Sequence, residues 1–281
     1  MISAENRSAA AGGEALLDVE GIRRSFGGLV ALDNVTFRVA AGQIKAVIGP
    51  NGAGKTTLFN IVSGVLPPDA GEIRFNGGEV TGRPPHEIVR LGMARTFQNP
   101  SLFLRMSAAE NVMVARHCRT RRGFWASALR WPGQPREERA IRESAMKYLT
   151  AVGLSALADV AVSALSFGQR RMVELARALA TEPKLLLLDE PASGLNTKEK
   201  DDLAALIVRI RGEGVTVLLV EHDMSLVMDV AEEILVLHFG TPIAEGAPAT
   251  IRNDPRVVSV YLGGGFAGAP GEESEMRIRQ P

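Results

Sequence analysis

A glycine-rich stretch between a short apolar run and a helix-forming run constrains the fold of this chain more than any other feature. Residues 49–56 read Gly-Pro-Asn-Gly-Ala-Gly-Lys-Thr and fit the pattern G-x-x-x-x-G-K-[ST]. The mostly apolar residues 44–48 predict a buried strand before it, and residues 57–62 predict a helix after it. Glycines let backbone N–H groups surround a phosphate, and the helix N-terminus adds partial positive charge. This context predicts a nucleoside-triphosphate site rather than an ordinary glycine-rich turn.

The side chains of this loop have separate expected roles. We expect the Lys55 ammonium to reach the β- and γ-phosphates and the Thr56 hydroxyl to hold Mg²⁺. The backbone of the other positions should line the phosphates. The predicted nucleotide-binding residues of this stretch are Gly49, Pro50, Asn51, Gly52, Ala53, Gly54, Lys55, Thr56 and Thr57.

Charge and cysteine content narrow the class of protein. The 32 Lys and Arg residues balance 32 Asp and Glu residues, which argues against a broad basic face for nucleic acid. Cys118 is the single cysteine, so an internal disulfide is excluded and a reducing compartment is expected. Residues 1–15 lack the apolar core of a secretory leader, and the most span-like stretch, 148–168, is too polar to insert. We therefore expect a soluble protein.

Apolar patterns predict strands on both sides of a helical block. Residues 16–39 alternate apolar and polar side chains around Gly27–Gly28, and residues 71–75 are also strand-like, which indicates antiparallel strands. Apolar runs at 185–188 and 215–220 predict buried strands of a parallel sheet with an amphipathic helix between them. No internal repeat is visible.

The helical block covers about residues 98–165 and is interpreted as an insertion. Ser107 and Glu110 form a capping-box pattern that starts a helix through residue 115, and residues 137–149 predict another helix. A helix over 169–180 then returns the chain to the core.

The expected fold class is α/β: a P-loop NTPase core with an antiparallel β subdomain and an inserted helical subdomain. The ordered domain is expected over residues 15–263. Residues 1–14 and 264–281 have the composition of disordered tails.

Two strand ends carry the remaining candidate chemistry. Asp189 and Glu190 follow the run at 185–188, and the carboxyl end of a strand beside a phosphate loop is where α/β sheets bind ligands. Asp189 is a candidate for the Mg²⁺ shell, and Glu190 for the base that acts on the attacking water. A helix-capping pair is the alternative. His222 follows the next strand and is a candidate for γ-phosphate contact or an ordinary surface histidine.

A further helix start stands out at Ser166. Ser166 and Gln169 form an S-x-x-Q pattern at the head of the helix that runs to residue 180. It is either an ordinary N-cap or a second phosphate-binding end that serves a site on another chain.

Taken in order along the chain, these motifs resemble the ATP-binding cassette ATPases. The set comprises the phosphate loop, Gln98 within Arg95-Thr96-Phe97-Gln98, the signature Leu165-Ser166-Phe167-Gly168-Gln169, the Asp189–Glu190 pair and His222.

The resemblance implies that two cassettes pair head to tail around two ATP molecules, so that Ser166, Gly168 and Gln169 of one chain face the Lys55 loop of the other. It implies that Gln98 joins Thr56 and Asp189 at Mg²⁺. It also implies that Phe26 stacks on adenine. Catalytic roles fall to Lys55, Glu190 and His222.

Finer features are similar to the ATPase of the branched-chain amino-acid importers. They include Phe167 and Asn196, where the wider family more often has Gly and Asp, a long insert over 119–131, the stretch 221–228 and the ending 240–246. The implied partners are a second cassette, two transmembrane permeases and, indirectly, a periplasmic substrate-binding protein, with no nucleic acid. The implied location is peripheral, on the cytoplasmic face of the inner membrane.

Several alternatives remain open at this level. The cargo could instead be urea or an exported lipid, or the chain could be a soluble cassette with no transport role. A catalytically dead cassette is disfavoured by the intact Lys55, Asp189, Glu190 and His222. The basic-aromatic insert over 119–131 is either solvated surface or a docking surface, and the region 97–110 is the better candidate for receiving a permease helix.

Overall fold

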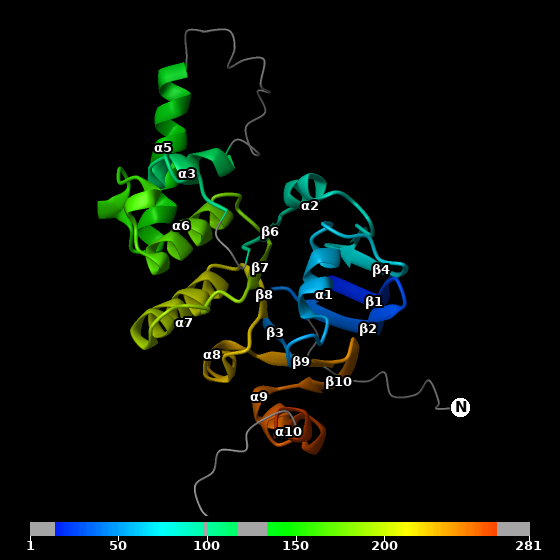
Figure 1. Cartoon of the computed structure of the whole chain (residues 1–281). Coiled ribbons are helices and arrows are strands. Elements are labelled where there is room, and N and C mark those ends of the chain that lie inside the picture. Colours follow the sequence, from blue (N-terminus) through cyan, green and yellow to red (C-terminus); the bar gives the residue numbers. More distant parts are fainter. Residues whose placement is uncertain (1–14, 98–100, 117–133, 263–281) are drawn as a thin grey trace, which may run out of the picture.

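The computed structural model describes residues 15–97, 101–116 and 134–262, and in these ranges it contains two β-sheets and a set of helices (Figure 1). The predicted tails, Gln98, Cys118 and the insert over 119–131 lie outside the described residues. Within the described ranges, no helix combines the length and apolarity needed to cross a bilayer.

The larger sheet has six strands and forms the centre of the molecule. Its strands β3, β7 and β8 are buried along their whole length, as expected for parallel strands covered on both faces. All neighbours pair in parallel except β9 and β10, which are antiparallel. The strand order is β10 (Thr241–Gly246), β9 (Glu233–His238), β3 (Ile44–Ile48), β8 (Thr216–Val220), β7 (Leu185–Asp189) and β6 (Met93–Arg95).

The smaller sheet is antiparallel and is built from the segments on either side of the phosphate loop. The turn after β1 contains Gly27, which has φ 57°, a value that favours glycine. In order across the sheet, the strands are β2 (Leu29–Ala40), β1 (Ala15–Phe26), β4 (Ala70–Phe75) and β5 (Gly78–Glu79).

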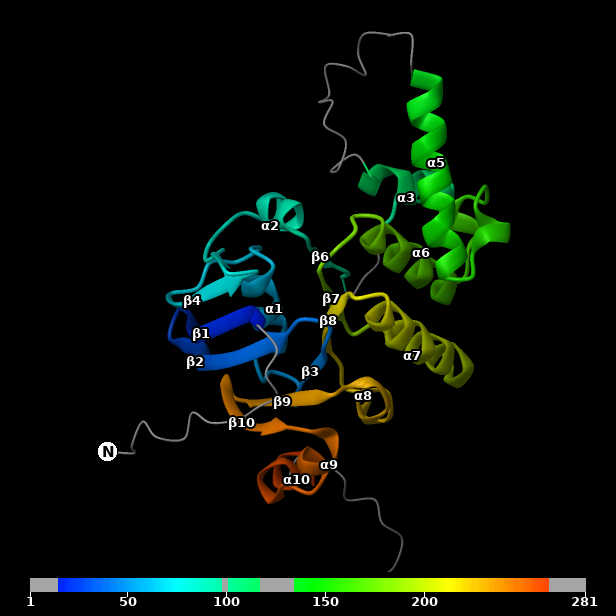
Figure 2. The ribbon, with the colours of Figure 1, turned by 180° about the vertical axis from the view of Figure 1, so that it is seen from behind.

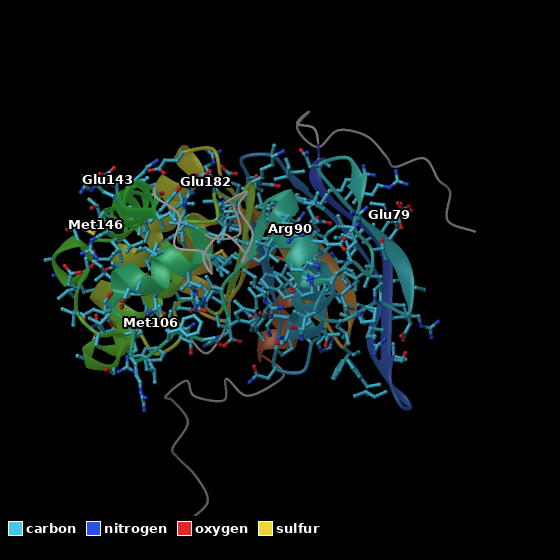
Figure 3. All side chains as sticks on the ribbon, turned by 90° about the horizontal axis from the view of Figure 1, so that it is seen from above. Glu79, Arg90, Met106, Glu143, Met146 and Glu182 are labelled. Carbon is cyan, nitrogen blue, oxygen red and sulfur yellow. The ribbon has the colours of Figure 1, made fainter. Side chains whose placement is uncertain are left out.

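Strand β7 shows how the central sheet separates two apolar cores. Leu185 and Leu187 pack with α1 (Lys55–Val62) and the smaller sheet, whereas Leu186 and Leu188 pack toward the helical layer. That layer holds α3 (Ala108–Arg116), α5 (Gln134–Ala151), α6 (Phe167–Leu179) and α7 (Thr197–Gly212). Figure 3 shows Glu143 and Met146 of α5 at the opposite end of the molecule from Glu79 of the smaller sheet.

Shorter elements complete the fold. They are α2 (Pro85–Leu91), the 3₁₀ turns Ser155–Leu157 and Val162–Ala164, α8 (Met224–Val230), α9 (Pro248–Arg252) and α10 (Pro255–Leu262). A third apolar cluster joins α8, α9 and α10 to β3 and β9.

The observed architecture confirms the predicted α/β fold class. The predicted start of a helix at Gln169 was wrong by two residues: α6 begins at Phe167, because Ser166 is its N-cap. The capping box predicted at Ser107 is present, with hydrogen bonds in both directions between Ser107 and Glu110.

Candidate nucleotide-binding site

The phosphate loop joins β3 to α1 along a path that two glycines make possible. A Cβ on Gly49 would lie 2.2 Å from the Leu237 carbonyl oxygen, and one on Gly54 would lie 2.6 Å from the Ala31 oxygen. Gly54 is the N-cap of α1 at φ 99°, and no side chain caps this end by a hydrogen bond. Among the described residues, no side-chain hydrogen bond therefore competes with a phosphate for the first N–H groups of α1.

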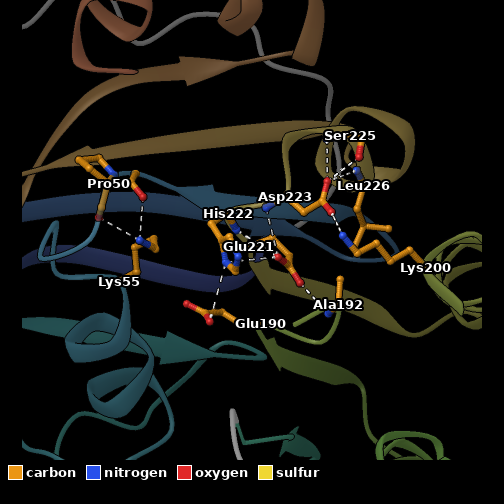
Figure 4. Close-up of polar contacts among 11 residues, drawn as sticks. Pro50, Lys55, Glu190, Ala192, Lys200, Glu221, His222, Asp223, Ser225 and Leu226 are labelled. Atoms are coloured by element: carbon orange, nitrogen blue, oxygen red, sulfur yellow. Dashed lines mark hydrogen bonds and ion pairs between the residues drawn. The ribbon is translucent and has the colours of Figure 1, made fainter. Parts of the chain in front are cut away.

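Lys55 lies inside this loop rather than in solvent. Its Nζ donates to the backbone oxygens of Gly49 at 2.7 Å and Pro50 at 3.0 Å, and the residue is 6% exposed (Figure 4). Burial lowers the pKa of the ammonium, and the negative charges of Glu190 and Asp189 oppose that shift. The loop thus holds a cation at its centre, beside two carboxylates.

The donor set fits a hard cation bound together with a nucleotide. Thr56 is exposed on the first turn of α1, so its hydroxyl is available as an oxygen ligand, and Asp189 ends β7. Among the described residues, no group of three His, Cys, Asp or Glu side chains is arranged to hold a metal without other ligands. Mg²⁺ favours one or two protein oxygens together with phosphates and water, which agrees with this set.

Glu190 has an unusual backbone conformation. Its φ is 46°, in the left-handed region that non-glycine residues rarely occupy, while its N–H donates to the Val220 oxygen at 2.9 Å. Strain of this kind persists where surrounding structure enforces it, commonly at functional sites. The carboxylate reaches toward His222, with Oε2 3.8 Å from Nδ1 (Figure 4). The two residues lie together at the carboxyl ends of β7 and β8, as the sequence predicts.

Glu221 is a residue of this site that sequence reasoning missed. It is fully buried and accepts hydrogen bonds from the backbone N–H groups of Ala192, His222 and Asp223 at 2.7, 3.1 and 3.3 Å. Burial raises the pKa of its carboxyl, although these N–H groups act in the opposite direction. Glu221 thereby ties the segment after Glu190 to the backbone of His222. A charged residue directly after an apolar strand was the signal available in the sequence.

Asp189 is paired in a way that the sequence did not indicate. Its Oδ2 accepts a hydrogen bond from Arg95 Nη2 at 2.7 Å, and the Asp189 and Arg95 side chains are 5% and 8% exposed. The predicted metal ligand therefore has a buried counterion from the end of β6.

Phe26 ends β1 and is 46% exposed, with the Arg24 guanidinium 5.0 Å from its ring centroid. An exposed aromatic face at this position remains available for stacking on a base.

Helix α6 and the helix that follows the phosphate loop pack in different apolar cores of the same chain. Helix α6 packs against α3, α5 and β6, and Figures 1 and 2 show α1 and α6 on opposite sides of β7 and β8. Ser166 and Gln169 form a capping box. The Ser166 N–H donates to Gln169 Oε1 at 2.9 Å, and the Gln169 N–H donates to the Ser166 hydroxyl at 3.2 Å. Ser166 and Gln169 thus bond to each other, whereas Lys55 bonds to Gly49 and Pro50 of its own loop.

The two departures from the wider family's pattern have local explanations. Phe167 is the first residue of α6 and has no positive φ, so this position does not need glycine. Its ring covers Gly194, where a Cβ would lie 2.8 Å from the Phe167 Cε1. Asn196 is the N-cap of α7 and forms a capping box with Glu199, a role in which Asn and Asp are about equally effective.

Comparison with known proteins agrees with this geometry. Residues 32–193 match the model of the ABC transporter family, and residues 241–267 match that of the branched-chain amino acid ATP-binding cassette transporter. The high-affinity branched-chain amino acid transport ATP-binding protein BraF of Pseudomonas aeruginosa is 47% identical over 249 residues, which cover 88% of this chain and 98% of that protein. LivG of Escherichia coli K12, which carries the same description, is 42% identical with the same coverage.

A solved structure extends the likeness to three dimensions. The ADP conformation of MJ1267, an ATP-binding cassette of an ABC transporter, matches with a TM-score of 0.78 and 33% identity, over 89% of this chain and 99% of that one. The chain therefore belongs to the ATP-binding cassette family of ABC transporters, among the relatives described as branched-chain amino acid transport ATP-binding proteins.

Proposed function

We propose that this chain is the ATP-hydrolysing subunit of an importer of branched-chain amino acids. The observation that carries the catalytic part is the meeting of Lys55, Glu190 and His222 at one edge of the central sheet. The Lys55 ammonium lies in the field of the Glu190 and Asp189 charges, and Glu190 Oε2 is 3.8 Å from His222 Nδ1. ATP binding and hydrolysis follow from membership of the family.

In the proposed mechanism each side chain acts on a different part of ATP. Lys55 and the N–H groups of α1 bind the β- and γ-phosphates. Thr56, Asp189 and Gln98 would hold Mg²⁺, which would neutralise negative charge on the phosphates. Glu190 orients the attacking water and accepts its proton, and His222 contacts the γ-phosphate.

A second cassette completes each site in this proposal. Ser166 is exposed, and α6 and α1 pack in different apolar cores of one chain, which supports a contact of the Ser166 end with the phosphate loop of a partner. Backbone N–H groups at a helix start suit a γ-phosphate. The partner is either another copy of this chain or a related cassette.

The proposed cargo and remaining partners follow the relatives' names. We infer two transmembrane permeases and, through them, a periplasmic substrate-binding protein, with this chain on the cytoplasmic face of the membrane. Phe97, Phe103 and Leu104 are 42%, 52% and 50% exposed, and this apolar surface supports permease docking there. No observation favours urea or lipid cargo.

The Glu190→Gln variant tests the catalytic assignment. It is expected to keep ATP affinity and to lower turnover by about 100-fold or more, because the amide no longer accepts a proton from water. ATP hydrolysis and ATP binding are measured on the purified assembly. Glu213→Gln is the matched control, since Glu213 is exposed at the C-terminus of α7 and should leave turnover unchanged. Turnover near that of the unaltered protein would refute the role of Glu190.

The same variant tests the partners and the cargo. When Glu190→Gln is purified with Mg-ATP from its native membranes, two polytopic permeases and a second cassette should co-elute. A substrate-binding protein that associates with this complex should bind leucine, isoleucine or valine. Co-elution with ribosomal or DNA-repair proteins and no permease would overturn the transport proposal.

A further inference from the structure

Arg95 joins the end of β7 to α1 through one buried guanidinium. Its Nη2 donates to Asp189 Oδ2 at 2.7 Å, and its Nη1 donates to Asn60 Oδ1 and Ser63 Oγ, both at 2.8 Å. Asn60 and Ser63 lie at the C-terminal end of α1, the helix that begins at the phosphate loop. The Arg95 side chain therefore links the predicted metal ligand directly to that helix.

Two aromatic rings restrict how this guanidinium can move. Its Cζ lies 5.8 Å from the centroid of the Phe59 ring and 5.2 Å from that of Phe97. Arg can donate several hydrogen bonds in fixed directions while it interacts with ring faces, and Lys, a point charge on a flexible stem, cannot reproduce that geometry.

The segment that carries Arg95 is also fixed to the helical layer. The Phe97 N–H donates to Glu174 Oε1 at 2.9 Å, and the Phe97 oxygen accepts from Arg171 Nη1 at 2.8 Å. Both charged side chains belong to α6 and are buried. Residues 95–97 thus have Asp189 and α1 on one side and α6 on the other.

We infer that Arg95 is a positioning residue that holds the Asp189 carboxylate where it can bind Mg²⁺. The inference rests on the proposed function, in which Asp189 is a metal ligand. Stability alone does not require this arrangement, because buried ion pairs can often be replaced by apolar residues without loss. The fixed direction of three hydrogen bonds is what orientation of a metal ligand requires, and partners behind a metal ligand typically set metal affinity.

The test measures how Mg²⁺ tightens nucleotide binding, independently of turnover. A fluorescent ATP analogue is bound to the protein in EDTA and then titrated with free Mg²⁺, and ATP hydrolysis is followed in parallel. Arg95→Lys keeps a positive charge beside Asp189, so the variant should fold. The half-saturating Mg²⁺ concentration should rise about 10-fold, while affinity for the analogue in EDTA stays unchanged.

A second variant keeps the inference falsifiable if Arg95→Lys fails to fold. Asn60→Ala removes one anchor of Arg95 and touches neither Asp189 nor the phosphate loop. It should raise the half-saturating Mg²⁺ concentration in the same direction by a smaller factor, about 3-fold. Arg256→Lys is the matched control, because Arg256 pairs with Asp254 on the surface and should leave the Mg²⁺ dependence unchanged.

The outcomes separate this inference from the proposed function. An unchanged or lower half-saturating Mg²⁺ concentration in Arg95→Lys, with only a lower thermal midpoint, would show a merely structural role and overturn the inference. The Asp189→Asn variant tests the premise that Asp189 is a metal ligand. If it shifts the Mg²⁺ dependence and Arg95→Lys does not, only the role of Arg95 fails. If Asp189→Asn has no effect, the metal assignment of the proposed function fails, and the inference with it.

Discussion

Helices α1 and α6 both begin at predicted phosphate-binding positions, but only α6 closes its first turn with its own side chains. Ser166 and Gln169 exchange hydrogen bonds at the start of α6. Helix α1 starts from Gly54 and has no side-chain cap. Because the first N–H groups of a helix need partners, α1 leaves that place to a ligand, whereas α6 is satisfied in part without one.

The difference between the two helix starts indicates that one acts when a single chain binds ATP and the other when two chains pair. The open end of α1 lies in a loop built around Lys55, so we expect a single chain to bind ATP there. The start of α6 is capped by its own side chains in a single chain, so we expect it to contribute after a second chain has brought ATP to it.

Among the changes considered, removal of the Lys55 charge should have the largest effect on the contrast between α1 and α6. Lys55→Ala should weaken ATP binding to the single chain by about 100-fold, because charge-assisted hydrogen bonds to the phosphates are lost. Isothermal titration with Mg-ATP measures this. Lys198→Ala is the control, since Lys198 is an exposed lysine in the first turn of α7. Equal ATP affinity in Lys55→Ala and the unaltered chain would end the distinction between the two helix starts.

Removal of the Ser166 hydroxyl should separate the role of the α6 start from that of the α1 start. Ser166→Ala should leave ATP binding to a single chain within about twofold, yet lower turnover of the paired cassettes by about 10-fold or more, since a donor to the γ-phosphate is lost. Ser107→Ala is a close control for paired cassettes without permeases: Ser107 caps α3 with the same 3.2 Å hydrogen bond and, although it lies in the region 97–110 predicted to receive a permease helix, it is not a predicted nucleotide-binding residue. Both variants should lose about 1 kcal/mol of stability. Equal turnover in the two would refute the role of the α6 end.

Helix α8 has a third N-terminus to compare, and we expect substitution of its N-cap residue to have the smallest effect of the three. Asp223 caps it and also accepts a hydrogen bond from Lys200 at 2.6 Å, which is the main reason that its pKa falls from 3.8 to about 2. A lowered pKa contributes stability above the unfolded value, and this is lost as the pH falls from about 4 to about 2.

Asp223→Asn keeps the cap and removes the charge. It should lower the free energy of unfolding by about 1 kcal/mol at pH 7. Urea unfolding at several pH values should show this gap closing at low pH. A constant gap down to about pH 2 would show that the ion pair with Lys200 is not its origin.

The residues that sequence could predict are those whose chemistry depends on neighbours in the chain. Loop 49–56 is recognisable because its glycines, lysine and threonine have fixed spacing, and β7 and β8 are recognisable as unbroken apolar runs. Helix ends were less accurate: α6 begins two residues before the predicted Gln169, because the backbone becomes helical directly after its cap.

Contacts between distant segments lay beyond sequence reasoning. Arg95 and Asp189 are separated by 94 residues, and nothing near either one indicates that they form a pair. Glu221 likewise reaches Ala192, 29 residues away. The left-handed backbone of Glu190 is imposed by the tertiary structure, since local preference opposes it.

The packing of Phe167 on Gly194 has a consequence for how relatives of this chain diverge. The ring occupies the space that a Cβ at position 194 would need. The two positions therefore compete for one small volume, although 27 residues separate them in the sequence. Gly194 also has φ 78°, a value that favours glycine by itself, so a small residue at 167 would remove the steric reason for glycine at 194 but not the backbone reason. The start of α6 and the segment after Asp189 and Glu190 should therefore be constrained together.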